Sequence, residues 1–188
     1  MAPPAEKPDY SSFNNWLFKS EGASRIEKGY DFKFSIEDLE ACKDQTTSWD
    51  GVRNYEARNF MKDYMKVGDE AFFYHSNVKI PGIVGLVEVT KESHPDPTQF
   101  DKKSYYYDAR ATVDNPKWFL VDVKLKRKLK RCISLEELKH WQKVHSMTQG
   151  PLSELRLIKR SRLSVIPISK EEWDFICSLE DQESVIDG

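Results

Sequence analysis

Apolar and polar residues alternate along several short segments of the chain, which is the pattern of β-strands with one buried face. Four such segments predict strands: residues 14–20, 69–75, 82–89 and 162–168. The second of these is apolar on both faces, as in a central or barrel strand. Gly85 lies in the middle of the third strand, where it is expected to mark a bulge or a close approach of another backbone.

A longer strand is predicted from Lys117 onward, because its apolar and basic residues separate onto two faces. The basic face is a lysine ladder made of Lys124, Lys126, Lys128 and Lys130. Such a ladder can follow a phosphate backbone, although a charged strand face is more often a solvated sheet edge. Arg160 and Arg162 are predicted to extend this phosphate-binding set, but the sequence does not fix their distance from the ladder.

Helix starts are predicted at three sequences that resemble capping boxes, namely 35–38, 134–137 and 169–172. Another helix is predicted over 52–65, where apolar residues form one stripe that Gly68 ends. Three prolines and the run Tyr105–Tyr107 predict a long loop over 93–116. Because strands and helices do not alternate regularly, the pattern predicts an α+β domain around a small curved or closed sheet.

The composition fits one folded domain: of 188 residues, 39% are hydrophobic, 12% aromatic and 32% charged. We expect a disordered leader over 1–13, one domain over 14–181 and a flexible tail over 182–188. No segment has the pattern of a signal peptide or a membrane span, so no membrane partner is predicted. The formal net charge of -2 excludes the strongly positive field of a general nucleic-acid coat protein. Any affinity for nucleic acid must therefore be local.

Enzyme and metal signatures are missing from the sequence. The three cysteines, Cys42, Cys132 and Cys177, are far apart and form no CxxC pair, which predicts reduced structural thiols and no metal site. There is no P-loop, G-x-S-x-G, H-E-x-x-H or dinucleotide fingerprint. A pairing of Cys42 or Ser76 with His75 has no recognisable activating context. The sequence therefore predicts a protein without catalysis and without a cofactor.

Three segments carry a resemblance to a known family: Trp16–Glu21 (WLFKSE), Trp49–Tyr55 (WDGVRNY) and Phe72–Ser76 (FFYHS). The match continues through further segments: Pro81–Gly85, Asn115–Trp118 with Val121–Val123, and Arg162–Val165. In this order and combination, the chain resembles the EVE domain, and most closely the eukaryotic branch of the thymocyte nuclear protein type. The resemblance implies a PUA-like β-barrel of five or six strands with flanking helices. It also implies nuclear localisation.

The resemblance further implies a pocket that receives one flipped-out base, with modified cytosine in DNA favoured. The base-pocket residues carried over are Trp16, Lys19, Ser20, Trp49, Gly51, Val52, Arg53, Asn54, His75 and Ser76. Flat aromatic surfaces and fixed donors and acceptors are what such a pocket needs, because stacking and edge contacts must offset the cost of unstacking the base.

Other interpretations of the same residues remain open. On residue type alone, both Trp16 and Trp49 are more often ordinary core residues, and His75 is more often a satisfied buried histidine. Arg53 is as consistent with an ion pair to Asp50 as with a contact to phosphate or base. The chain as a whole fits two alternatives: an RNA-binding PUA-like module, or a protein-interaction adaptor that uses the tyrosine-rich loop.

Overall fold

The structure is a computed structural model that describes residues 8–186. The outer parts of the expected leader (1–13) and tail (182–188) therefore lie outside the described residues. Within the described part, the Tyr10 ring packs edge-on against Phe60 and Tyr64, with centroids 5.0 and 5.6 Å apart. This portion of the expected leader thus lies on the domain. No helix in the described part of the chain is long and apolar enough to cross a membrane.

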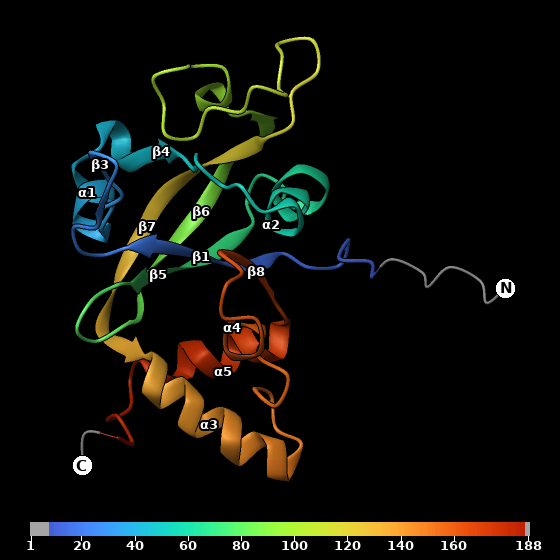
Figure 1. Cartoon of the computed structure of the whole chain (residues 1–188). Helices are drawn as coiled ribbons and strands as arrows, with labels where there is room; N and C mark the ends of the chain where they lie inside the picture. The colour runs from blue at the N-terminus through green and yellow to red at the C-terminus, as the bar shows by residue number, and fades with distance from the viewer. Residues whose placement is uncertain (1–7, 187–188) are drawn as a thin grey trace, which may run out of the picture.

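Six strands form one mixed sheet in the order β4-β7-β6-β5-β1-β8 (Figure 1). The strands are β1 (Asn15–Glu21), β4 (Thr46–Ser48), β5 (Glu70–Ser76), β6 (Gly82–Pro95), β7 (Phe119–Ser134) and β8 (Val165–Ile168). Only β1 and β5 run parallel; the other neighbours in this sheet are antiparallel. The α+β prediction with six strands and flanking helices is confirmed. The end strands β4 and β8 do not pair with each other, so the sheet is open and forms only a loose barrel.

The remaining elements surround this sheet. The helices are α1 (Ile36–Ala41), α2 (Tyr55–Asn59), α3 (Leu135–Thr148), α4 (Arg156–Lys159) and α5 (Lys170–Leu179). A small hairpin is formed by β2 (Ile26–Glu27) and β3 (Tyr30–Asp31), and short turns of helix occur at η1 (Lys43–Gln45), η2 (Phe60–Tyr64) and η3 (Pro97–Gln99). In Figure 1, α3, α4 and α5 gather at one end of the sheet, whereas the loop after η3 lies at the other.

Local capping signals explain where several helices begin. Ser35 and Ser169 form complete capping boxes with Asp38 and Glu172, as predicted. Ser134 caps α3 through the backbone N–H of Glu137, but the carboxylate of Glu137 instead pairs with Arg131.

The predicted helix over 52–65 is shorter in the structure. It begins at Tyr55, because the side-chain oxygen of Asn54 accepts a hydrogen bond from the backbone N–H of Ala57 at 2.9 Å. It ends in the π turn η2, in which the Met65 N–H donates to the Phe60 carbonyl at 3.2 Å.

Bulges change the register of the two long strands. The pairing of β6 with β7 shifts next to Gly85, as the sequence predicts, and a Cβ at Gly85 would lie 2.9 Å from the Arg127 carbonyl oxygen. A second shift leaves Lys126 opposite no residue of β6 and breaks the alternation of the lysine ladder. β6 also continues to Pro95, so the predicted loop over 93–116 begins as strand.

Aromatic side chains on β1 and β5 pack on both faces of the sheet. On one face, Phe72 stacks on Trp173 of α5, with ring centroids 4.1 Å apart. Phe73, the next residue along the strand, contacts Trp49 edge-on at 5.6 Å. Phe18 of β1 also packs against Trp49, at 4.8 Å. This packing holds the segment after β4 against the sheet.

Candidate functional site

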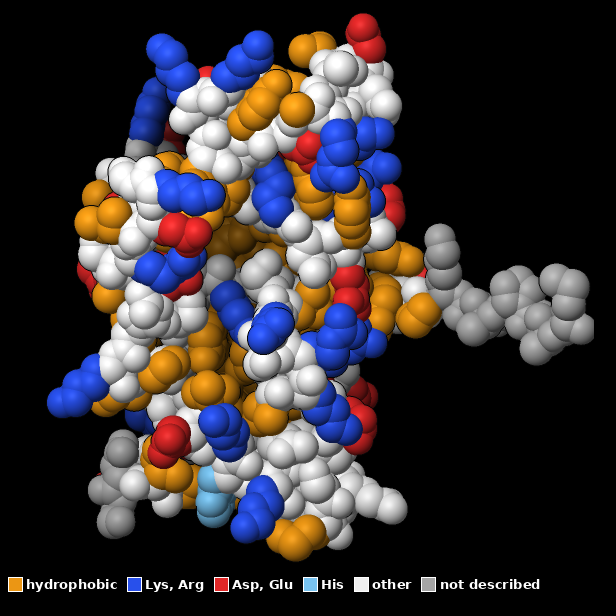
Figure 2. Space-filling model, in the orientation of Figure 1, with side chains coloured by type: hydrophobic (Ala, Val, Ile, Leu, Met, Phe, Trp, Pro, Cys, Tyr) orange, Lys and Arg blue, Asp and Glu red, His pale blue; other side chains and the backbone are white. Residues whose placement is uncertain are grey.

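A pocket of about 540 Å³ opens between the end of β1, the β2–β3 hairpin and the loop that follows β4. In the space-filling view, this region is hollowed, with hydrophobic side chains at the bottom and lysines and arginines around it (Figure 2). We call it the main pocket. Its volume lies within the roughly 300–1,000 Å³ of sites that bind small molecules.

Most of the predicted base-pocket residues line the main pocket. They are Lys19, Ser20, Trp49, Gly51, Val52, Arg53 and Asn54. The loop after β4 supplies most of them. Asn54 is also the cap of α2, and the Ser20 hydroxyl donates to the Phe34 carbonyl, so both side chains hold the pocket wall together.

The conformation of the loop after β4 depends on Gly51. Its φ of +77° lies in the left-handed region that glycine adopts without strain. Its N–H donates to a carboxylate oxygen of Asp96 at 2.9 Å. A Cβ at this position would lie 2.5 Å from the ring of Tyr106. A glycine is therefore needed both for the turn and for the close approach of the tyrosine.

The guanidinium of Arg53 is fully used inside the protein. Its Nη1 donates to Asp96 at 2.9 Å and to the Val52 carbonyl at 3.1 Å, and its Nε donates to the Tyr106 carbonyl at 3.1 Å. Its Nη2 donates to the same Tyr106 carbonyl at 2.7 Å and to the Thr98 hydroxyl at 3.0 Å. These bonds occupy every N–H of the side chain. The ion pair that the sequence left open is thus made with Asp96 and not with Asp50, and Arg53 braces the pocket wall.

Asp96 is the buried partner of this brace, with only 1% of its side chain exposed. Burial raises the pKa of its carboxyl, but hydrogen bonds from Thr98, Arg53 and Gly51 outweigh burial and leave the pKa below its ordinary value. The carboxylate therefore stays charged at neutral pH. It joins the start of the long loop to the segment after β4.

Trp49 is both a core residue and part of the pocket lining. It is only 7% exposed and packs against Phe18, Phe34 and Phe73. No atom of residues 8–186 accepts a hydrogen bond from its indole N–H. The nitrogen is also not fully enclosed, so a ligand in the pocket can reach it. The pocket thus offers one unused donor in its aromatic lining.

The sequence interpretation missed most of the aromatic wall. Tyr30, Phe32, Phe34 and Tyr106 all line the main pocket. Tyr106 contacts Tyr30 edge-on at 5.7 Å, and burial raises the pKa of both phenols. The alternation of aromatic residues from 30 to 34 was a readable signal. Tyr106 belongs to the run that was considered only for an adaptor loop.

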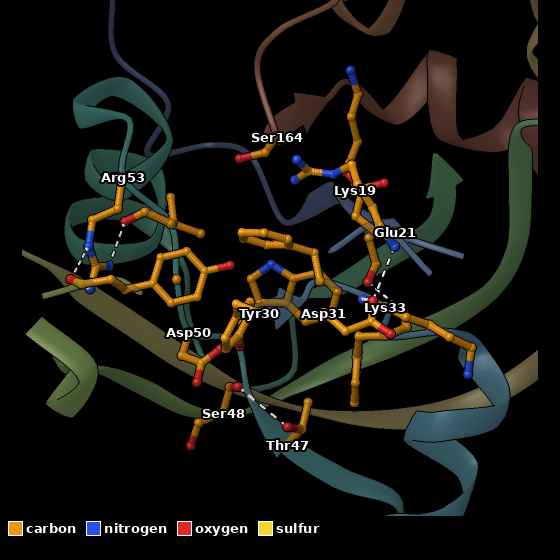
Figure 3. A pocket seen from close by; sticks show the side chains of 18 of the residues that line it. Lys19, Glu21, Tyr30, Asp31, Lys33, Thr47, Ser48, Asp50, Arg53 and Ser164 are labelled. Carbon is orange, nitrogen blue, oxygen red and sulfur yellow. Dashed lines mark hydrogen bonds and ion pairs between the residues drawn. The ribbon is translucent and has the colours of Figure 1, made fainter. Parts of the chain in front are cut away.

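Of the three acidic residues that line the main pocket, Asp31 is bonded to Ser24, Arg25 and Lys33, and Asp50 and Glu21 lie on opposite sides (Figure 3). Burial raises the pKa of Asp50, and the charge of Asp96 adds to this effect. One oxygen of Glu21 pairs with Arg25 at 3.3 Å, whereas the other, Oε2, is buried without a hydrogen-bond partner among residues 8–186. The Asp50 carboxylate has no side-chain partner among these residues and can accept a hydrogen bond from a ligand, whereas Oε2 of Glu21 is enclosed by protein atoms.

The structure places three predicted base-pocket residues outside the main pocket. Trp16 is fully buried in the core, where its indole N–H donates to Asp69 at 2.9 Å. His75 accepts a hydrogen bond from the backbone N–H of Ile36 at 3.0 Å, and burial lowers its pKa. The Ser76 hydroxyl donates to the Ser20 carbonyl at 3.1 Å. The polar groups of all three side chains thus make internal bonds of the fold.

The predicted phosphate-binding residues do not form one free surface. Lys126 pairs with Glu70, Lys128 with Glu40 and Glu37, Lys130 with Asp181, and Arg160 with Glu56. Within the described part of the chain, Lys124 and Arg162 have no carboxylate partner. None of the six lines the main pocket.

The sequence of the chain matches the model of a known protein family. The model of the EVE domain matches residues 14–179. The chain belongs to the EVE domain family. This confirms the resemblance, and two of the segments that carried it, Trp16–Glu21 and Trp49–Tyr55, contribute residues to the main pocket of this EVE domain.

Similar proteins are found in animals, fungi and protozoa. Thymocyte nuclear protein 1 of Rattus norvegicus is 58% identical over 170 residues, which is 90% of this chain and 75% of the relative. An uncharacterised protein of Schizosaccharomyces pombe is 42% identical over 184 residues, 97% of this chain and 72% of the relative. A hypothetical protein from Leishmania major has a similar structure, with a TM-score of 0.74, 40% identity and coverage of 90% and 95% of the two chains.

One solved structure of a relative contains a nucleic acid. It is the crystal structure of human THYN1 protein in complex with DNA that contains 5-methylcytosine. This chain matches it with a TM-score of 0.87 and 56% identity, over 90% of this chain and 98% of that one.

Proposed function

We propose that this EVE domain is a non-catalytic reader of modified DNA that takes one extruded base, with modified cytosine favoured, into the main pocket. The observation that carries the proposal is an aromatic pocket large enough to hold a base, whose wall is fixed by internal bonds while a few polar groups in its lining remain unused. The crystal structure of the human relative with DNA containing 5-methylcytosine supports this choice of ligand.

The unused groups match the edge of a cytosine. Its amino group is a donor, for which the Asp50 carboxylate is an acceptor. Its carbonyl oxygen is an acceptor, for which the indole N–H of Trp49 is a donor. Stacking on aromatic side chains contributes about 1–3 kcal/mol per base, which helps to offset the cost of extrusion.

Basic residues outside the main pocket are proposed to hold the flanking phosphates. Lys124 and Arg162 are the better candidates among the predicted set, because the other four cations already have carboxylate partners in the described part of the chain. We also propose nuclear localisation, which the name of the animal relatives supports.

Fluorescence titration with matched oligonucleotides tests this function. One cytosine or one 5-methylcytosine is placed in otherwise identical single- and double-stranded DNA and in the corresponding RNA. We expect the methylated DNA to bind most tightly, and Trp49→Phe to weaken this binding, because phenylalanine keeps the core packing but removes the N–H donor. Met147→Ala serves as the control, since Met147 is 73% exposed on α3 and does not line the pocket.

Equal, weak binding to all oligonucleotides that Trp49→Phe does not change would exclude the proposal. Tighter binding of the RNA strand would favour the RNA-binding module, since contact with the ribose hydroxyl distinguishes the two nucleic acids. Absence of any nucleic-acid binding, together with salt-insensitive capture of a protein, would favour the adaptor.

A further inference from the structure

A second groove of about 360 Å³ adjoins the main pocket. The two share Lys19, Glu21 and Ser164 in their linings. We call it the second groove. Its other walls come from the end of β5, from the turn that precedes β6, from the first residue of α3 and from α4 with the segment that follows it. The proposed recognition of a single base uses only Arg162 of this groove, for a flanking phosphate, and assigns no role to its apolar lining.

The end of β1 forms the border between the two cavities. The backbone N–H of Lys19 donates to the Ser164 carbonyl at 2.9 Å, which ties the end of β1 to the segment before β8. The ammonium of Lys19 donates to the Ser161 carbonyl at 2.7 Å, and burial lowers its pKa. Figure 3 shows Lys19 and Ser164 together at one edge of the main pocket. A strand that leaves the main pocket across this edge enters the second groove.

The lining of the second groove combines apolar surface with positive charge, and the Glu21 carboxylate, which also lines it, is paired with Arg25 at 3.3 Å. Leu135, Leu157 and Pro81 supply the apolar part, together with the ring of Tyr74. The Lys19 ammonium lies 5.9 Å from the centroid of that ring. An apolar surface beside a cation suits the flat face of a base and its phosphate.

Arg162 supplies the second cation of the groove. It is exposed, and within residues 8–186 it has neither a carboxylate partner nor a side-chain hydrogen bond. In contrast, Arg160 lies two residues earlier and pairs with Glu56. A guanidinium without an internal partner keeps all its donors available for a phosphate.

We propose that the second groove binds the nucleotide next to the extruded one, with its base over the apolar lining and its phosphodiester between Lys19 and Arg162. The inference rests on the proposed function, because the extruded base must occupy the main pocket. The ligand of the whole site is then a dinucleotide unit of one strand. Ser76, which the sequence assigned to the base pocket, lines this neighbouring groove.

The test compares a mononucleotide with dinucleotides by calorimetry. The probes are 5-methyl-deoxycytidine monophosphate and two dinucleotides that carry thymidine on its 5′ or its 3′ side. Because a stacked base and a phosphate contact are added, we expect one of the two dinucleotides to bind about tenfold more tightly than the mononucleotide. The other dinucleotide should resemble the mononucleotide, because the border of the main pocket leads into the groove in one direction.

Two variants test whether the tighter binding of the dinucleotide arises in the second groove. Arg162→Ala removes the free cation, and Leu135→Glu places a carboxylate in the groove at the first turn of α3, where a negative charge is tolerated by the helix. Both should reduce the affinity for the dinucleotide to within about twofold of that for the mononucleotide, and Leu135→Glu, which lies outside the main pocket, should leave the mononucleotide affinity unchanged. Lys143→Ala, on the exposed surface of α3, removes one charge elsewhere and should preserve the gain. Thermal unfolding verifies that all variants are folded.

Each outcome decides between the two proposals. If the mononucleotide binds but neither dinucleotide binds more tightly, or if the gain survives both groove variants, the second groove is not a nucleotide subsite and the reader function stands. If neither the mononucleotide nor the dinucleotides bind, the proposed function fails and the subsite fails with it.

Discussion

Replacing Asp96 with alanine removes the acceptor on which the wall of the main pocket depends. The carboxylate accepts hydrogen bonds from Gly51 and Arg53, both at 2.9 Å, and from the backbone N–H of Thr98 at 2.8 Å. It is 1% exposed, so water cannot replace it without entering the protein. The substitution leaves the Arg53 charge without its counter-ion in a partly buried place.

The expected loss of stability in Asp96→Ala follows from the burial of Asp96 and Arg53. Breaking a buried ion pair by removing one partner costs about 3–5 kcal/mol, chiefly because the other charge is left unpaired. The Arg53 side chain is 21% exposed, so water still reaches part of the guanidinium. We therefore expect Asp96→Ala to lower the free energy of unfolding by about 3 kcal/mol, at the lower end of that range.

The assay is urea unfolding of four proteins: wild type, Asp96→Ala, Arg53→Met and the double variant. Because the two side chains act on one network, the double variant should lose less stability than the sum of the single variants, by about 1 kcal/mol or more. Since the bonds to Asp96 hold its pKa below the ordinary value, the wild type should also lose stability as the pH falls below about 4 and through the native pKa. Asp96→Ala should lack this part of the acid sensitivity.

A loss of less than about 1 kcal/mol for Asp96→Ala, or strictly additive single effects, would refute the view that this pair fixes the pocket wall. Binding of DNA gives an independent readout. If the wall must be in place before the base enters, Asp96→Ala should weaken binding even under conditions in which the protein is fully folded.

Three further predictions concern other parts of the molecule. Gly51→Ala should cost about 1–2 kcal/mol of backbone strain and also displace the ring of Tyr106, so that it weakens DNA binding. Gly68→Ala is the control: Gly68 has a φ of +92° and nothing within 4 Å of the new methyl group, so this variant should cost only the strain. Burial lowers the pKa of His75 and His145, whose ring nitrogens accept backbone hydrogen bonds. The free energy of unfolding should therefore fall as the pH drops below about 6.5, by at most about 1.4 kcal/mol per pH unit for each histidine. A flat profile between pH 7 and 5 would contradict this. Lys124→Ala should reduce the slope of log K against log salt by about one if this lysine contacts phosphate, and an unchanged slope would remove it from the interface.

Features that depend on neighbouring residues in sequence were predictable. Ser35 and Ser169 begin helices because each side chain caps a backbone N–H three residues later, which the sequence shows directly. The break in the lysine ladder at Lys126 was not predictable, because the bulge there depends on which residues of β6 pair with β7. Likewise, the carboxylates that pair with Lys128 and Lys130 come from α1 and from the segment after α5.

The same distinction between local and long-range features applies to the residues of the candidate site. The loop from Trp49 to Asn54 is continuous in sequence, so its residues could be proposed together. Tyr106 enters the pocket from a loop 53 residues beyond Arg53, to which its carbonyl is bonded, and no local pattern links the two. His75 was assigned to the base edge by its place at a strand end, yet its acceptor nitrogen holds the start of α1 instead.

The bonding of Arg53 bears on how such a pocket selects its ligand. A cation in a signature segment suggests a direct ligand contact, but here every N–H of the guanidinium is engaged within the protein. A donor that is already bonded contributes little to affinity, because it must give up one partner to gain another. The groups that gain most from a ligand are those left unused and reachable from the pocket, namely the indole N–H of Trp49 and the carboxylate of Asp50. Selectivity is therefore expected to respond more strongly to changes at these two groups than to changes of charge at the pocket rim.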